Sequence, residues 1–248
     1  MAEKEKDVYG LIGYPLGHSF SRAFFTEKFQ REHINAEYRN FEIPEASQLL
    51  DIVRETPDLK GLNCTIPHKQ AIIPFLDELS DEAREIGAVN VVKVMPGGKL
   101  KGYNADIIGF MDSIRPLLKP HHRRALVLGT GGASKAVCAG LSKLGLEWMY
   151  VSRTPKEGQL TYADLTEDVL AGYQVIVNCS PVGMYPHVDE TPALPYHLLT
   201  KDYLLYDLIY NPEMTRFMQL GQARGATVKN GLEMLHLQAL ASWKFWQE

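Results

Sequence analysis

A lysine and an aspartate in the first half of the chain occupy places that packing alone does not explain. Lys69 follows Pro67 in the first turn of a predicted helix, where the helix dipole opposes a cation. A lysine with a lowered pKa can transfer a proton in acid–base catalysis. Asp106 ends the segment Gly102-Tyr-Asn-Ala-Asp106 and also suits the cap of the next helix. Both are candidates for proton chemistry, although a solvated lysine and a capping aspartate are the simpler alternatives.

Four other polar residues lie in or beside apolar segments. Asn63 and Thr65 end a predicted strand, Asn90 interrupts another, and Gln238 lies in a helix that is apolar nearly all round. A buried amide needs hydrogen-bond partners, and each residue could find them locally. Taken together, they indicate a polar cleft between two domains, as expected at the strand ends of an open α/β sheet.

The second half contains a glycine-rich turn typical of dinucleotide binding. The residues Gly129, Thr130, Gly131, Gly132, Ala133 and Ser134 lie between an apolar strand and a predicted helix. Gly129 permits a tight turn, Gly131 lets the backbone approach a pyrophosphate, and the small Ser134 suits close helix–strand packing. The helix N-terminus would supply N–H donors to the phosphates. A structural turn without a ligand is the alternative.

The end of the following strand bears on the choice of nucleotide. Ser152, Arg153 and Thr154 occupy this corner, and no carboxylate does. An acidic residue here would bind the ribose 2′-hydroxyl of NAD, whereas an arginine accommodates the 2′-phosphate of NADP. The corner therefore favours NADP, although an exposed arginine is also common on protein surfaces.

These residues need an α/β framework to position them. Apolar patterning predicts strands over 8–12, 38–43, 59–65, 88–95, 99–103, 125–128, 148–151, 175–178 and 204–208, and helices over 22–31, 46–53, 67–76, 107–118, 135–144 and 232–246. The turn at 96–98 predicts a hairpin. Alternating apolar strands and helices imply a parallel sheet covered on both faces. We predict two α/β domains, residues 1–104 joined by helix 232–248, and residues 105–231 with a Rossmann-type fold.

The composition is that of an ordinary globular protein. The 248 residues contain 26 Lys and Arg against 30 Asp and Glu, and the net charge of −4 argues against nucleic-acid partners and a polybasic membrane patch. Cys64, Cys138 and Cys179 match neither a disulfide framework nor a zinc pattern, which indicates a reducing compartment and no metal. No signal segment and no apolar run of roughly 20 residues is present. We expect a cytoplasmic protein with a small-molecule substrate.

The order of motifs along the chain resembles the shikimate dehydrogenase family over nearly the full length. The matching segments are Gly13–Ser21, Gly61–Lys69, Gly87–Asn90, Gly102–Asp106, Gly129–Ser134, Ser152–Thr154, Asn178–Met184, Tyr206–Pro212 with Thr215, and Asn230–Gln238. The resemblance implies a substrate-binding N-terminal domain, an NADP-binding Rossmann-type domain and a cleft between them. It also implies reversible reduction of 3-dehydroshikimate to shikimate, in the pathway to chorismate and the aromatic amino acids, by a monomer or homodimer.

The resemblance assigns roles to individual residues. Lys69 and Asp106 become the catalytic pair. The implied substrate-binding residues are Ser19, Ser21, Asn63, Thr65, Asn90, Tyr210 and Gln238. The implied cofactor-binding residues are Gly129, Thr130, Gly131, Gly132, Ala133, Ser134, Ser152, Arg153, Thr154, Ser180, Gly183, Met184 and Gly231.

The chain also departs from the family pattern at several positions. Arg22 follows the second loop serine where proline is usual, and Ala105 precedes the catalytic aspartate where threonine is usual. Ser152 replaces the usual asparagine of the nucleotide corner, and Lys156 is the basic residue available beyond it. These changes bear on cofactor affinity and on packing at Asp106, but none removes a residue that the chemistry requires.

Three alternatives remain open at this point. A quinate/shikimate dehydrogenase with relaxed cofactor use would share most of the site, but an acidic residue would better suit its nucleotide corner. A folate-type methylene dehydrogenase shares the two-domain plan but should lack the paired serines and the Asn-x-Asp segment. A non-catalytic sensor of shikimate-pathway metabolites would bind without turnover, and the presence of both Lys69 and Asp106 argues against it.

Overall fold

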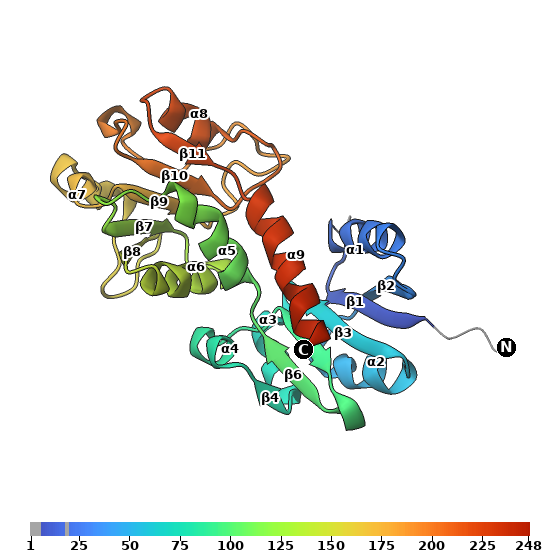
Figure 1. Cartoon of the computed structure of the whole chain (residues 1–248). Coiled ribbons are helices and arrows are strands. Elements are labelled where there is room, and N and C mark those ends of the chain that lie inside the picture. Colours follow the sequence, from blue (N-terminus) through green and yellow to red (C-terminus); the bar gives the residue numbers. More distant parts are fainter. Residues whose placement is uncertain (1–5, 18–19) are drawn as a thin grey trace. The chain divides into compact units, whose positions relative to one another are not determined.

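The structure is a computed structural model that describes residues 6–17 and 20–248. The chain divides into two compact units (Figure 1). Unit 1 comprises the chain up to Ala105 together with Ala239–Glu248, and unit 2 comprises Asp106–Gln238. Helix α9 (Leu232–Gln247) begins in unit 2 and ends in unit 1. No helix in the described ranges is long and apolar enough to cross a membrane.

Unit 1 is built on a mixed sheet. Its strands are β1 (Asp7–Gly13), β2 (Ala36–Glu42), β3 (Leu59–Cys64), β4 (Glu78–Leu79), β5 (Val91–Val94) and β6 (Leu100–Tyr103), in the order β2-β1-β3-β5-β6-β4. Its helices are α1 (Phe20–Arg31), α2 (Leu49–Glu55), α3 (His68–Ala71) and α4 (Asp81–Ile86), with 3₁₀ turns at Ala46–Gln48, Ile73–Phe75 and Pro96–Gly98. Strands β1, β2 and β3 run parallel, and β5 pairs antiparallel with β3 and β6. The predicted hairpin is therefore confirmed.

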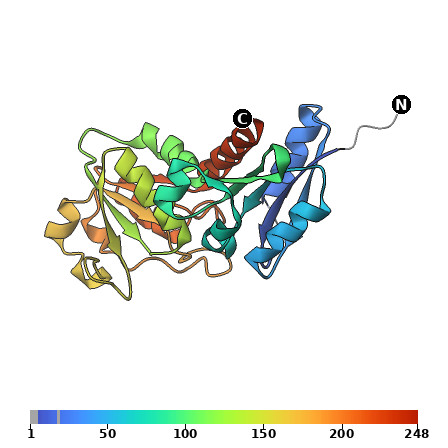
Figure 2. The same ribbon diagram turned by 90° about the horizontal axis from the view of Figure 1, so that it is seen from below.

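Consecutive residues of β1 point to opposite faces of this sheet. Val8 packs in a core with Leu49 of α2, whereas the Tyr9 ring lies 5.6 Å from that of Phe29 in α1. Helices α1 and α2 thus cover opposite faces (Figures 1 and 2).

The end of α9 packs on the same face as α1. Tyr9 lies 5.4 Å from the Trp243 ring and 4.9 Å from the Trp246 ring. The Trp246 indole N–H donates to the Val92 carbonyl at 3.1 Å, and the ring lies directly over Gly61, where a Cβ would overlap it. Aromatic rings at these separations stabilise the packing beyond the burial of their area, so they fix the last turns of α9 on unit 1.

Unit 2 is built on a parallel sheet. Its strands are β7 (Arg124–Leu128), β8 (Glu147–Val151), β9 (Val175–Asn178), β10 (Leu204–Asp207) and β11 (Thr227–Lys229), in the order β11-β10-β9-β7-β8. Its helices, besides the start of α9, are α5 (Asp106–Ile114), α6 (Gly132–Lys143), α7 (Glu167–Ala171) and α8 (Arg216–Gln222), with 3₁₀ turns at Arg115–Leu117, Tyr162–Asp164 and Tyr196–Leu198.

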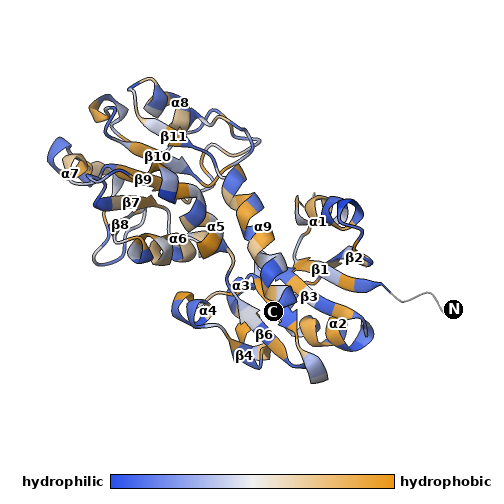
Figure 3. Ribbon diagram, in the orientation of Figure 1, coloured by the Kyte–Doolittle hydropathy of each residue, from blue (hydrophilic) through white to orange (hydrophobic). Residues whose placement is uncertain are grey.

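Both faces of this sheet are buried. One face packs Val127 and Val177 against Phe110 of α5 and Leu141 of α6. The other packs Leu126, Leu128 and Ile176 against Leu170 of α7 and Phe217 of α8. Hydrophobic colour marks the strands at the centre of the sheet in Figure 3. This is the doubly covered parallel sheet that the sequence predicts, and the α/β fold class is confirmed.

Two predicted helices are shorter in the structure because of internal prolines. The helix predicted over 67–76 is α3 alone, followed by a 3₁₀ turn that contains Pro74. The helix predicted over 107–118 ends at Ile114, before a 3₁₀ turn that contains Pro116. Proline lacks the backbone N–H and clashes with the preceding turn, so these predictions of length were wrong.

Candidate active site

The turn between β7 and α6 has the backbone that its glycines predict. Gly129 has a φ of 94°, and a Cβ there would lie only 3.2–3.3 Å from Ser180. Gly131 is the N-cap of α6 and has open space around it. Ser134 is fully buried, and its Oγ donates to the Gly131 carbonyl at 2.7 Å. The turn is therefore packed on its sheet side and open where a ligand would approach.

The first turn of α6 offers backbone donors at this open end. The helix begins with Gly132 and Ala133, and Gly131 has no side chain with which to cap it. Unpaired N–H groups and the helix dipole make such an end an anion-binding site. The geometry suits the pyrophosphate of a dinucleotide.

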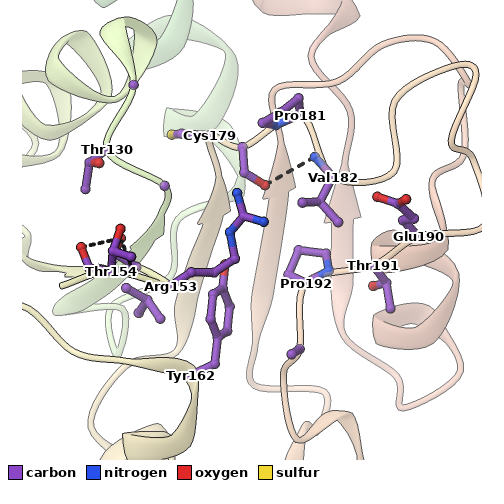
Figure 4. A pocket seen from close by; sticks show the side chains of 16 residues that line it. Thr130, Arg153, Thr154, Tyr162, Cys179, Pro181, Val182, Glu190, Thr191 and Pro192 are labelled. Carbon is purple, nitrogen blue, oxygen red and sulfur yellow. Dashed lines mark hydrogen bonds between the residues drawn. The ribbon is translucent and has the colours of Figure 1, made fainter.

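A cavity of about 620 Å³ opens beside this turn (Figure 4). This volume is in the range of cofactor sites. Its lining includes the predicted residues Gly129, Thr130, Gly131, Ser152, Arg153, Thr154 and Ser180. The lining also includes residues to which the sequence assigned no role, namely Val151, Tyr162, Glu190, Thr191, Pro192 and Ala193, together with Cys179, Pro181 and Val182 of the matching segment Asn178–Met184. The predicted residues Gly132, Ala133, Ser134, Gly183, Met184 and Gly231 lie outside this lining.

Arg153 supplies the positive charge of the cavity. Figure 4 shows its guanidinium in the middle of the lining residues, close to the Tyr162 ring. Burial raises the pKa of the Tyr162 phenol, and the Arg153 charge opposes that rise. The Thr154 N–H donates to Ser152 Oγ at 3.3 Å, which fixes the backbone of the corner. A guanidinium binds phosphate in a bidentate manner, so this corner fits the 2′-phosphate of NADP.

Buried polar residues lie at the strand ends next to the cavity. The carboxylate of Asp207 accepts hydrogen bonds from Asn178 Nδ2 (3.0 Å), the Ile209 N–H (3.1 Å) and Thr215 Oγ1 (2.7 Å). Burial raises the pKa of Asp207 to about 6, although these hydrogen bonds oppose the rise. Asn178 Oδ1 in turn accepts from the N–H and the hydroxyl of Ser180, a residue of the cavity wall.

Several predicted substrate residues come together in unit 1. Asn63 is buried at the end of β3, where its Oδ1 accepts from the Tyr38 phenol at 2.8 Å. The Asn63 Nδ2 donates to Ser242 Oγ at 2.9 Å and contacts the Asn90 carbonyl at 3.4 Å. Ser21 of α1 hydrogen-bonds the same Tyr38 phenol. Tyr38 therefore links Ser21 to Asn63, a role for which no local pattern in the sequence is a signal.

The segment that carries Lys69 is tied to Asn90 and to the backbone before Asp106. Lys69 is half-buried, and its carbonyl accepts from the Val89 N–H at 2.7 Å. Asn90 Oδ1 accepts from the N–H of Ala105 at 2.6 Å. Asp106 is one peptide bond further and is the first residue of α5. The backbone before Asp106 is thus fixed by Asn90 without the hydroxyl that the family usually has at position 105.

His68 holds the short helix that contains Lys69. It is buried, and its Nε2 lies 2.6 Å from the Ile43 carbonyl. The histidine lies in the matching segment Gly61–Lys69, but the sequence assigned it no role. A four-residue helix has little stability of its own, so this contact helps to position Lys69.

The remaining predicted substrate residues fall in different places. Thr65 follows β3 in unit 1. Tyr210 and Gln238 belong to unit 2, where Tyr210 is exposed and Gln238 is buried. Gly109 of α5 packs on Gln238 of α9, so these two helices lie together in unit 2 with Asp106 one turn before Gly109. Ser19 lies outside the described residues.

The fold and the site define a two-unit α/β oxidoreductase with a dinucleotide pocket in its Rossmann-type unit. The shikimate dehydrogenase substrate binding domain family matches residues 11–92 of the chain. A shikimate dehydrogenase (NADP(+)) of Desulforamulus reducens is 35% identical over an alignment 260 residues long, which covers 96% of this chain and 89% of that protein. The chain belongs to the shikimate dehydrogenase family.

Solved structures agree with this relation. The shikimate dehydrogenase of Aquifex aeolicus is 36% identical with a TM-score of 0.85, and the match covers 99% of this chain and 94% of that one. The shikimate 5-dehydrogenase of Thermus thermophilus, solved with NADP(H) and shikimate, is 30% identical with a TM-score of 0.84. That match covers 96% of this chain and 92% of the other. The likeness extends over both units.

Proposed function

We propose that this protein catalyses the reversible, NADP-dependent reduction of 3-dehydroshikimate to shikimate, in the pathway to chorismate and the aromatic amino acids. The observation that carries the proposal is the cavity of unit 2, where the Gly129–Gly131 turn and Arg153 fit NADPH. The relatives of the chain are NADP-dependent shikimate dehydrogenases over nearly its full length, which supports the substrate. Unit 1 would bind the substrate and unit 2 the nucleotide.

The cofactor residues take roles that follow from their places. The Gly129–Ser134 segment and the first turn of α6 would bind the pyrophosphate. Arg153, between Ser152 and Thr154, would bind the 2′-phosphate. Ser180, Gly183, Met184 and Gly231 would lie beside the nicotinamide. NADPH, when bound, supplies the hydride.

Lys69 and Asp106 would handle the proton. In reduction, the Lys69 ammonium would donate a proton to the oxygen formed from the C3 carbonyl, and in oxidation the neutral amine would accept it. Asp106 would orient Lys69 and the substrate hydroxyl as a coupled pair. Such acid–base assistance contributes typically about 10²–10⁴-fold to the rate.

The substrate would be held by polar groups that match its carboxylate and hydroxyls. Ser19, Ser21 and Tyr210 would bind the carboxylate. Asn63, Thr65, Asn90 and Gln238 would bind the ring hydroxyls. Because Asn90 Oδ1 is occupied by the Ala105 N–H, we assign its Nδ2 to the substrate. Sites built to hydrogen-bond a hydroxyl strongly reject analogues that lack it.

The test is the fall in NADPH absorbance when 3-dehydroshikimate is added to the pure protein, with NADH and 3-dehydroquinate in parallel. Rapid oxidation of NADPH with 3-dehydroshikimate alone is the expected result. Comparable rates with NADH or 3-dehydroquinate would move the protein to the quinate/shikimate branch. Binding of both ligands without turnover would favour a metabolite sensor.

The Lys69→Ala variant tests the catalytic assignment. It should reduce kcat by about 10²–10⁴-fold and change the binding of 3-dehydroshikimate much less. Lys244→Ala, a change of an exposed lysine on α9, is the matched control and should keep normal turnover. Normal turnover in Lys69→Ala would rule out the assigned role.

A cytoplasmic location and a monomeric or homodimeric state complete the proposal. All three cysteines are free thiols, which suits a reducing compartment. Gel filtration with light scattering would determine the oligomeric state.

A further inference from the structure

Two buried polar residues end neighbouring strands next to the nucleotide cavity. Asn178 is the last residue of β9 and Asp207 the last residue of β10, and the two are paired in the register of the parallel sheet. Both side chains are fully buried. In an open α/β sheet the carboxyl ends of the strands face the ligand, so this pair lies at the edge where a nucleotide would bind.

The Asp207 carboxylate fixes which way the Asn178 amide points. Asp207 Oδ1 accepts from Asn178 Nδ2 and from the Ile209 N–H, while its Oδ2 accepts from Thr215 Oγ1. An ionised carboxylate can only accept hydrogen bonds. Asn178 must therefore present its Nδ2 to Asp207 and its Oδ1 to the opposite side.

This orientation continues into the cavity wall. Asn178 Oδ1 accepts from the Ser180 N–H at 3.1 Å and from the Ser180 hydroxyl at 2.7 Å. Because the Ser180 hydroxyl donates its proton to Asn178, its oxygen is left as an acceptor, and it accepts from the Val182 N–H at 3.4 Å (Figure 4). Ser180 and Val182 both line the cavity. Asn178 Nδ2 also donates to the Val182 carbonyl at 3.4 Å, so the amide joins the cavity wall to Asp207 on both of its sides.

We propose that Asp207 is a positioning residue for the nucleotide: acting through Asn178, it fixes the Ser180–Val182 segment in the shape that admits NADPH. The inference rests on the proposed use of NADPH by this site. It assigns a role to a side chain that does not line the cavity. A residue that only stabilised the fold would affect unfolding but not nucleotide affinity.

The experiment measures NADPH binding to full-length protein at equilibrium, together with KM for NADPH and kcat. Asp207→Ala removes the acceptor and should raise the Kd for NADPH about tenfold, equivalent to about 1.4 kcal/mol, with kcat at saturating NADPH within about threefold of wild type. Asp207→Asn should keep the Kd for NADPH within about twofold of wild type. Asn178 Nδ2 and the Ile209 N–H can still donate to its amide oxygen, and Thr215 Oγ1 can accept from its Nδ2.

Tyr206→Phe is the matched control for stability. Tyr206 is the preceding residue of β10, fully buried, and its phenol is 2.6 Å from Ser113 Oγ, away from the cavity lining. Its loss should lower the melting temperature without changing the Kd for NADPH. The inference is overturned if Asp207→Ala binds NADPH like wild type, or if Asp207→Asn loses as much affinity as Asp207→Ala. If wild type itself fails to bind NADPH, the proposed function fails instead.

A second variant serves if Asp207→Ala does not fold. Asn178→Asp places a carboxylate against Asp207, so the pair offers a donor only while it holds a proton. Burial raises the pKa of Cys179 and of Tyr196, and the negative charge of Asp207 raises both further, so these two groups remain neutral. The Kd of this variant relative to wild type should rise at least about fivefold between about pH 6 and about pH 8. A constant ratio would overturn the inference.

Discussion

Tyr38→Phe is a small change with a distinct expected effect on substrate binding. The Tyr38 phenol donates to Asn63 Oδ1 at 2.8 Å and hydrogen-bonds Ser21, while its ring stacks on Phe25 at 4.9 Å between centroids. Burial raises the pKa of Tyr38 well above its usual value, so the phenol stays protonated. Phenylalanine keeps the stacked ring and removes only the hydroxyl that joins two proposed substrate residues.

The size of the effect follows from the groups left behind. Asn63 is buried, and a buried acceptor that loses its donor destabilises a protein by about 1–3 kcal/mol. For a chain of this length, each kcal/mol lowers the melting temperature by about 2–4 °C. Loosening Asn63 and Ser21 should also raise the KM for 3-dehydroshikimate about five- to tenfold, or roughly 1–1.4 kcal/mol. The KM for NADPH and kcat should change by less than about twofold.

The assay is steady-state kinetics with each substrate varied in turn, alongside thermal unfolding. Tyr206→Phe is again the control, because it removes a buried phenol hydrogen bond in unit 2. The two variants should lose similar stability, but only Tyr38→Phe should raise the KM for 3-dehydroshikimate. If both variants raise it equally, or if neither does, Tyr38 only stabilises the fold.

Three other changes test separate parts of the structure. Arg153→Ala should raise the KM for NADPH about 10- to 100-fold and leave the KM for NADH nearly unchanged, because a charge-assisted hydrogen bond to the 2′-phosphate contributes about 1.5–3 kcal/mol. Initial rates with both nucleotides measure this. An equal rise in both KM values would contradict the role of Arg153. Gly61→Ala should destabilise the protein by about 1–3 kcal/mol, because a Cβ would overlap the Trp246 indole; urea unfolding followed by tryptophan fluorescence measures this, and an unchanged midpoint would refute it. The Asp207 carboxyl has a folded pKa of about 6 against an ordinary value of 3.8, so the folded state binds more protons and stability falls as pH rises from about 4 to about 6. Cys179 and Tyr196, which face Asp207, stay neutral there because burial raises the pKa of both. Asp207→Asn should remove about 2 kcal/mol of that fall, measured as the difference from wild type in unfolding free energy at the two pH values; identical slopes would contradict the shift.

Local patterns predicted most of the framework. The apolar run at 175–178 is β9 without adjustment, and the Pro-Gly-Gly turn at 96–98 joins β5 to β6 as predicted. These elements follow from side-chain alternation and turn chemistry within a few residues. The glycine-rich turn was predictable for the same reason, since Gly129 needs the positive φ that it has.

Helix α4 was missed although the sequence contains its signals. Helix α4 is capped at its start by Ser80, whose side chain accepts from the Ala83 N–H, and at its end by Gly87, which has a φ of 66°. A serine before Asp-Glu and a glycine at the end are typical helix boundaries.

Strand β4 has two residues and β11 has three, so neither presents enough alternation to be detected.

The site was less predictable than the fold because its contacts connect distant segments. Glu190 and Tyr162 reach the cavity from a loop and from a 3₁₀ turn, and neither follows a strand end that would mark it. Tyr38 and Asn63 are 25 positions apart, and Asn178 and Asp207 are 29 apart. No local period relates such pairs, so only the folded sheet shows that they touch.

In each unit the side-chain amide of a buried asparagine at a strand end is connected to a serine: Asn178 to Ser180 directly, and Asn63 to Ser21 through Tyr38. The orientations of the two amides are not equally restricted. Asn178 faces Asp207, which can only accept, so a flipped amide would place an oxygen against a carboxylate. Asn63 faces the hydroxyls of Tyr38 and Ser242, and each hydroxyl can donate or accept. Its orientation is set mainly by the Asn90 carbonyl at 3.4 Å, a long contact. Removing Asp207 leaves Asn178 Nδ2 with only its 3.4 Å contact to the Val182 carbonyl, whereas Tyr38→Phe leaves both partners of Asn63 Nδ2 in place. Removing Asp207 should therefore release the Ser180–Val182 segment more completely than Tyr38→Phe releases Ser21.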